Sequence, residues 1–195
     1  MVSLSKTQYG IYAECVGHNG EICYNLPYLY TLDPSLDAKR LCKAIETAVK
    51  AHPTLFTRIV LSDEGEPMQT IVDEAFSVAM EDIDDIEAVK PSLVKPFDIY
   101  ADRLFRIRLL RDASHLYLFI DYHHIIVDGT SMHLLLGDID KAYRGLDLDK
   151  EELTLAEVAA KETTDRQSAA FSEAKQWYAQ NFDCGDVFTQ LIPDL

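Results

Sequence analysis

The feature that most constrains this chain is a pair of adjacent histidines in residues 123–129, which read HHIIVDG. The preceding residues, 115–122, alternate and are rich in aromatic and β-branched side chains, which predicts a strand. The following residues, 130–143, carry apolar side chains at helical spacing, with Thr130 or Ser131 as the expected N-cap. The motif therefore lies where a strand ends and a helix begins, a junction that holds side chains at the edge of a sheet.

The alternation of a strand separates the two histidines, since successive side chains point to opposite faces. His124 continues the row of Leu116 and Tyr122, whereas His123 continues the row of Asp121. Because neighbouring histidines on a strand do not readily ligate one metal ion, no metal site is expected. Asp128 could orient a ring or fix the turn by a salt bridge, and Gly129 is expected to supply backbone freedom to that turn.

Composition fits one globular domain. The 195 residues are 48% hydrophobic and 26% charged, and 18 basic against 33 acidic residues give a net charge of −15. This excess of acid argues against nucleic acid and anionic membranes as partners. No apolar run approaches the roughly 18 residues of a membrane span, and the N-terminus lacks a signal-peptide core. The cysteines form no CxxC pair and are expected as reduced thiols in a cytoplasmic protein; they are Cys15, Cys23, Cys42 and Cys184.

Periodicity predicts an α/β fold in two layers, with helices packed on a mixed, largely antiparallel sheet. Pro27 favours an edge or bulge position for the first main strand. The last two strands form a natural pair that brings Arg106 and Arg108 towards the histidine motif. Strands are predicted at 24–32, 55–61, 67–72, 76–80, 104–110 and 115–122. Helices are predicted at 3–14, 36–49, 130–143, 153–165 and 167–182, with a short one within 82–94 and a linker at 185–195.

Three segments resemble core motifs of the condensation domains of nonribosomal peptide synthetases, which are chloramphenicol acetyltransferase-like acyltransferases. Residues 4–12 resemble the first motif, with Gln8 at its glutamine, and residues 52–58 resemble the second, although Phe56 stands where the family usually has arginine. The HHIIVDG stretch matches the HHxxxDG active-site motif without departure. The resemblance identifies residues 1–195 as the N-terminal lobe of a two-lobed domain whose C-terminal lobe is absent from this chain.

The resemblance implies peptide-bond formation between aminoacyl or peptidyl thioesters. No cofactor would be bound, since phosphopantetheine arms of upstream and downstream carrier domains bring the substrates, and an adenylation domain belongs to the same synthetase. His124 would be the central catalytic residue, either as a base or by positioning the amine and stabilising the oxyanion. Three other motif residues would support His124. His123 would be packed, and Gly129 would lie at the turn. Asp128 would form an ion pair with Arg58, Arg106 or a residue of the absent lobe. An isolated lobe is expected to be inactive.

Two other functions fit parts of this pattern. A free-standing CoA-dependent acetyltransferase of the chloramphenicol acetyltransferase type also has one lobe per chain and completes its site as a trimer. In such enzymes the motif lies near the C-terminus, whereas here 195 − 124 = 71 residues follow His124. The other alternative is a non-catalytic module that only docks carrier domains. Among related domains, epimerisation domains share the histidine pair, so the motif does not exclude that function. Heterocyclisation domains replace the pair with an aspartate motif, which argues against that function.

Overall fold

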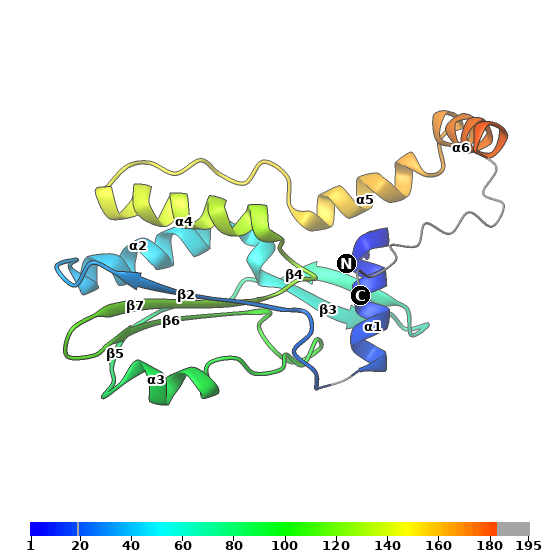
Figure 1. Ribbon diagram of the computed structural model, residues 1–195. Helices are drawn as coiled ribbons and strands as arrows, with labels where there is room; N and C mark the ends of the chain where they lie inside the picture. Colours follow the sequence, from blue (N-terminus) through cyan, green and yellow to red (C-terminus); the bar gives the residue numbers. More distant parts are fainter. Residues whose placement is uncertain (19, 183–195) are drawn as a thin grey trace, which may run out of the picture.

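The computed structural model describes residues 1–18 and 20–182, which fold into layers around a four-stranded sheet. The strands of this sheet are β2 (Asn25–Leu32), β5 (Met80–Asp82), β6 (Phe105–Arg111) and β7 (Leu116–His123). The helices α2 (Ala38–Ala51) and α4 (Gly129–Arg144) lie over one face, and the short α3 (Ile86–Val89) lies against the other (Figure 1). The predicted α/β class, with helices on a mixed and largely antiparallel sheet, is confirmed.

The strand β7 lies inside the sheet, and all eight of its residues are buried. It pairs antiparallel with β6 on one side and with β2 on the other, while β5 is parallel to β6. One row of β7 side chains joins the core beneath α2 and α4, and the opposite row packs with Ile86 of α3. As predicted from Pro27, β2 is an edge strand. The first row is Leu116, Leu118, Ile120 and Tyr122, and the second includes Tyr117 and Phe119.

A second, three-stranded sheet was not foreseen from the sequence. It contains β1 (Val2–Ser3), β3 (Thr57–Leu61) and β4 (Pro67–Ile71) in the order β1-β4-β3. The strands predicted at 55–61 and 67–72 therefore form, as the antiparallel pair of β3 and β4, but they belong to a sheet of their own. The strand predicted at 76–80 is wrong, since only β5 forms, at its far end. Side chains hold the backbone there instead: Arg103 donates to the Ala75 carbonyl, and Val78 N–H donates to Glu46.

The helices begin where side chains satisfy their first backbone amides. In α1 (Lys6–Gly17) the N-cap Ser5 and Gln8 form a reciprocal capping box. In α2 the Asp37 carboxylate accepts from the N–H of Arg40, and the helix ends at His52, before proline. The apolar stripe of α2 then packs on the sheet because its side chains recur every three or four residues. The buried residues of this stripe are Leu41, Ala44, Ile45, Ala48 and Val49.

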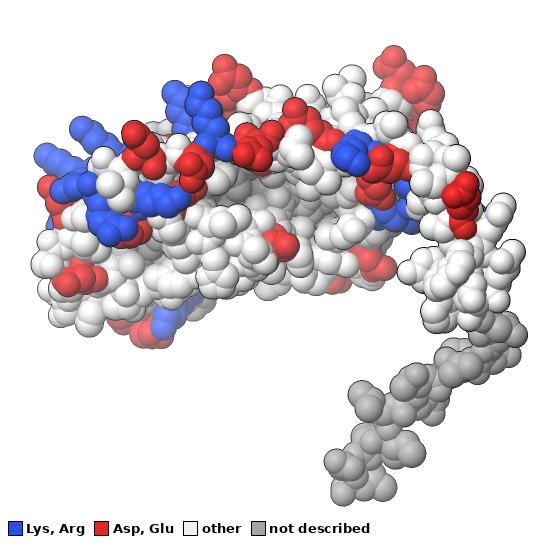
Figure 2. All heavy atoms as spheres, turned by 90° about the horizontal axis from the view of Figure 1, so that it is seen from above, with Lys and Arg blue, Asp and Glu red and all other residues white. Residues whose placement is uncertain are grey.

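Beyond α4 the chain turns at Gly145, whose left-handed φ of 77° suits glycine and ends the helix. The predicted helices that follow are confirmed as α5 (Leu155–Asp165) and α6 (Ala169–Asn181); the one-turn helices η1 (Pro53–Phe56) and η2 (Lys90–Ser92) complete the elements. Figure 2 shows acidic and basic side chains interspersed over α2, α4 and α5. No helix within the described residues has the length and apolarity to cross a bilayer. The linker predicted at 185–195, like Cys184, lies outside the described residues.

Candidate functional site

The HHIIVDG motif forms the turn between β7 and α4, at the end of the most buried strand. His123 is the last residue of β7, and the N–H of His124 donates to the Tyr24 carbonyl at 2.8 Å, just before β2 begins. The N–H of Ile126 then returns to the His123 carbonyl at 3.1 Å. Ile125 and Ile126 are buried, so two apolar anchors and the sheet hold the turn from both ends.

The side chain of His124 is exposed, and its ring is oriented by its own turn. Nδ1 lies 2.8 Å from the Val127 carbonyl oxygen. Because a carbonyl only accepts hydrogen bonds, Nδ1 carries the hydrogen in this contact. In the neutral imidazole, Nε2 then holds the free lone pair, and within the described residues it has no hydrogen-bond partner. The ring is thus fixed in the tautomer that offers an acceptor to solvent.

The neighbouring histidine, His123, is buried and only 4% exposed. Its Nδ1 accepts from the N–H of Ile125 at 3.2 Å, so its Nε2 carries the hydrogen and faces Cys15 Sγ at 3.4 Å. The rings of Tyr24 and Phe97 lie beside it. Burial, followed by the charge of His124, lowers the pKa of His123 to about 4. His123 is therefore a neutral anchor for the turn near pH 7.

The carboxylate of Asp128 caps α4, which corrects the prediction that Thr130 or Ser131 does so. Oδ1 accepts from both the backbone N–H and the hydroxyl of Ser131, each at 2.8 Å. These hydrogen bonds, first from the backbone and then from the side chain of Ser131, hold the pKa of Asp128 below its usual value, and the charge of His124 adds a smaller effect. The structural role expected for Asp128 is thus exerted through helix capping.

The predicted ion pair of Asp128 with Arg58 or Arg106 does not form. Arg58 pairs with Glu74 at 2.6 Å, and Arg106 pairs with Asp121 at 3.1 Å. The register of the hairpin explains the second pairing, because Arg106 of β6 stands directly opposite Asp121 of β7. Both residues belong to the row of His123, whereas Asp128 lies past the strand's end.

Gly129 also differs from expectation. Among the described residues positive φ angles occur only at Gly20, Gly65 and Gly145, so the turn before α4 does not require left-handed backbone. A Cβ built on Gly129 would meet nothing within 4 Å. The observed consequence of glycine is open space at the first residue of α4, close in sequence to His124.

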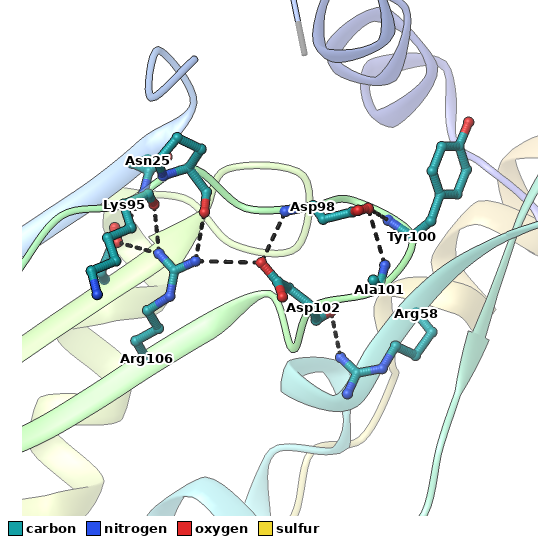
Figure 3. Close-up of polar contacts among 10 residues, drawn as sticks. Asn25, Arg58, Lys95, Asp98, Tyr100, Ala101, Asp102 and Arg106 are labelled. Carbon is teal, nitrogen blue, oxygen red and sulfur yellow. Dashed lines mark hydrogen bonds and ion pairs between the residues drawn. The ribbon is translucent and has the colours of Figure 1, made fainter. Parts of the chain in front are cut away.

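Arg106 also makes contacts that the sequence did not reveal, since it binds two backbone carbonyls and the Asp102 carboxylate in the loop of residues 95–102 (Figure 3). Its guanidinium donates to the carbonyls of Lys95 at 2.6 Å and Pro96 at 2.7 Å, and lies 3.6 Å from the centre of the Phe97 ring. Asn25 donates to both the Lys95 carbonyl and Asp121 Oδ2. This network fixes the loop that presses Phe97 against His123.

The remaining histidines do not join the motif. His52 Nε2 lies 2.9 Å from Asp138 Oδ2, beside a cavity of about 400 Å³. His18 and His115 lie next to the carboxylates of nearby residues, and His133 is exposed on α4. Within the described residues, no cluster of three or more histidine, cysteine or acidic side chains is placed to hold a metal ion. Among the described histidines, His124 is the one whose exposed ring lies at the end of β7.

Comparison with known proteins agrees with the motif. The sequence matches the family model of the condensation domain over residues 1–194. Gramicidin S synthase 2 of Aneurinibacillus migulanus is 32% identical over 185 residues, which are 92% of this chain and 4% of that synthase. Surfactin synthase subunit 2 of Bacillus subtilis (strain 168) is 34% identical over 151 residues, which are 74% of this chain and 4% of that subunit. The chain thus spans a small part of the curated relatives it matches.

Solved structures show the same fold. The starter condensation domain of rhizomide synthetase RzmA superimposes with a TM-score of 0.80 at 18% identity, over 93% of this chain and 48% of that one. The first condensation domain of the CDA synthetase gives a TM-score of 0.73 at 19% identity, over 95% of this chain and 51% of that one. In both cases this chain covers about half of the solved domain. With the family match spanning nearly all its residues, the chain belongs to the condensation-domain family.

Proposed function

We propose that this chain is the N-terminal lobe of a condensation domain and that it forms peptide bonds together with a C-terminal lobe. The observation that carries the proposal is the exposed ring of His124, whose Nδ1 is bound to the Val127 carbonyl. The donor would be an acyl or peptidyl thioester on an upstream carrier domain, and the acceptor an aminoacyl thioester on a downstream one. The match of this chain to about half of each solved domain supports the proposal that a second lobe completes the domain.

In the proposed reaction, the acceptor's α-ammonium group must lose a proton before its nitrogen can attack. Nε2 of His124 accepts that proton, and the amine forms a C–N bond with the donor's thioester carbonyl. The tetrahedral intermediate then expels the phosphopantetheine thiolate as the C–S bond breaks. The nitrogen gives a second proton to the thiolate, so an amide and a free thiol result, while His124 keeps the first proton. Orientation of two tethered substrates lowers the barrier further.

The tautomer distinguishes between the two roles considered for His124. To stabilise an oxyanion, a neutral ring would need hydrogen on the outward nitrogen. With Nδ1 donating to Val127, that hydrogen is absent from Nε2, and the ring is suited to accept a proton. The geometry therefore favours the base over the oxyanion donor in the neutral state.

The proposed partners follow from this role. They are the upstream and downstream carrier domains with their phosphopantetheine arms, the C-terminal lobe, and an adenylation domain that loads the acceptor. We place the reaction in the cytoplasm, which is supported by the free thiols of Cys15, Cys23 and Cys42. The family match favours this reaction over CoA-dependent acetyl transfer.

The experiment compares His124→Ala with His133→Ala in the complete two-lobed domain within its synthetase. Loss of a base should lower the single-turnover rate of amide formation about a hundredfold or more. His133 is exposed on α4 and outside the motif turn, so its variant should keep the wild-type rate. If His124→Ala forms the dipeptidyl product at the wild-type rate, the role proposed for His124 is wrong. Retained binding of loaded carriers without product in the wild type would instead show a docking module.

A further inference from the structure

Two buried glutamines lie behind the motif turn, and one of them was not singled out in the sequence. Gln8 of α1 is 3% exposed, and Gln69 of β4 is 0% exposed. A carboxamide in such surroundings is costly unless its donors and acceptor are satisfied. Both side chains are paired, and the pair connects the smaller sheet with the motif turn.

The two carboxamides bind each other reciprocally. Gln8 Nε2 donates to Gln69 Oε1 at 3.0 Å, and Gln69 Nε2 donates to Gln8 Oε1 at 2.8 Å. The second hydrogen of Gln69 binds the Ser3 carbonyl at 3.2 Å, while Ser5 N–H donates to Gln8 Oε1 at 3.0 Å. The second hydrogen of Gln8 binds the Ile125 carbonyl at 3.2 Å. All four amide hydrogens are therefore in use.

This network admits one orientation of the Gln8 amide. If that amide were rotated by half a turn, its NH2 group would face two donors, the Ser5 N–H and the Gln69 NH2 group. Its oxygen would at the same time face the Ile125 carbonyl, an acceptor against an acceptor. Gln69 is itself fixed by the Ser3 carbonyl of β1. Gln69, together with the Ser5 N–H, thus holds Gln8 with a donor towards the motif turn.

We propose that Gln69 is a positioning residue for His124, acting through Gln8 and the backbone of the motif turn. The carbonyl that Gln8 holds belongs to Ile125, which follows His124 directly, and Val127, whose carbonyl orients the His124 ring, lies two residues further on. Fixing the peptide after Ile125 fixes the direction of the chain into Val127. The catalytic consequence rests on the function proposed above, but the geometric one does not.

The test is nitrogen NMR of the histidine rings in the 195-residue chain carrying Gln69→Met, a substitution of similar length without polar atoms. Ring nitrogens with and without hydrogen resonate in well-separated ranges. In the wild type, His124 should show a protonated Nδ1 and an unprotonated Nε2 at a pH where the ring is neutral. In Gln69→Met, we expect both signals to move towards intermediate positions, because the tautomers mix when Val127 is no longer held. Unchanged His124 signals in the folded variant would overturn the proposal.

The matched control is Thr57→Val, in the adjacent strand β3. Thr57 is also 0% exposed, and its hydroxyl donates to the Thr54 carbonyl at 2.7 Å, a hydrogen bond in which neither glutamine and no residue of 123–129 takes part. This variant should lose a comparable buried hydrogen bond while leaving the His124 signals in place. An equal change in both variants would show general loosening and would contradict a specific role of Gln69. If Gln69→Met does not fold, Gln69→Asn replaces it, since it keeps a carboxamide but shortens its reach to Gln8.

A rate measurement in the intact synthetase separates this inference from the proposed function. Gln69→Met should lower kcat about tenfold to a hundredfold with little change in KM, because a misplaced group costs rate more than binding. Altered His124 signals with an unchanged rate would support the positioning by Gln69 and reject the catalytic role of His124. Unaltered signals reject the positioning whatever the rate.

Discussion

At the scale of residues, two histidines adjacent in sequence occupy opposite environments. His123 is sealed against Tyr24, Phe97 and Cys15, whereas His124 is exposed and bound through Nδ1 to Val127. The division follows from the pleat, because His123 ends β7 and the next side chain, that of His124, points to the opposite face. One ring can therefore anchor the turn while the other stays available for chemistry.

The buried ring makes stability depend on pH. Since the folded pKa of His123, about 4, lies below the ordinary value of histidine, the unfolded chain binds a proton over that interval and the folded chain does not. The unfolding free energy that depends on a neutral His123 is fully present above about pH 6.5. It decreases as pH falls towards 4, by up to about 3 kcal/mol. Urea unfolding at pH 7 and pH 5 should show a smaller loss of unfolding free energy for His123→Asn than for wild type. Identical losses, with exposed His133→Asn as control, would contradict this assignment.

At the scale of elements, the β6–β7 hairpin holds the strand that leads into the motif turn. Its register places Arg106 opposite Asp121, which is 0% exposed, and the same guanidinium holds the loop of residues 95–102 (Figure 3). Burial is the main influence on Asp121 and raises its pKa, while Asn25 and Arg106 oppose that effect. The strand pair and the loop are thus coupled through one buried carboxylate.

This coupling predicts unequal effects for two arginines on the same strand. Arg106→Met leaves a buried carboxylate without its cation and should lower the unfolding free energy by about 3 kcal/mol or more. Arg111→Met removes an ion pair with Asp82 whose two side chains are exposed, and should cost less than about 1 kcal/mol. Urea denaturation of both variants compares them directly. Equal destabilisation would mean that Asp121 does not depend on Arg106.

Regular elements were predictable because periodicity over many residues reports which face is buried. The α2 stripe and the alternation of β7 are examples, and both segments formed where expected. Short features depend on single contacts that spacing does not encode. The capping of α4 by Asp128, the side-chain support of residues 75–78, and the separation into two sheets are of this kind.

The candidate site was predictable to a similar extent. The exposure of His124 and the burial of His123 follow from alternation along one strand. The partners of Arg106 do not, because the loop of residues 95–102 has no periodic signal and meets the strand only in the folded chain. The contact of Gln69 with Gln8 could not be predicted for the same reason. A glutamine in a hairpin strand belongs to no motif, and its partner lies 61 residues away in the sequence.

At the scale of the whole molecule, the motif turn lies where the two sheets and α4 approach one another (Figure 1). Gln8 of α1 donates to the Ile125 carbonyl of the turn and is itself bound by Gln69 of the smaller sheet. The strand β7 precedes the turn and α4 follows it. The chain matches about half of each of the two solved condensation domains, and the other half of such a domain corresponds to the second half proposed above. In the proposed arrangement, that second half closes over the exposed ring of His124 and excludes water from the reaction.

The most direct measurement is the pH dependence of single-turnover amide formation by the complete domain, for wild type and His124→Ala. If Nε2 of His124 takes the proton from the acceptor's ammonium group, removing the ring should lower the rate at every pH and should also change the shape of the pH profile. Two profiles with the same shape and height would contradict the assignment of His124 as the base.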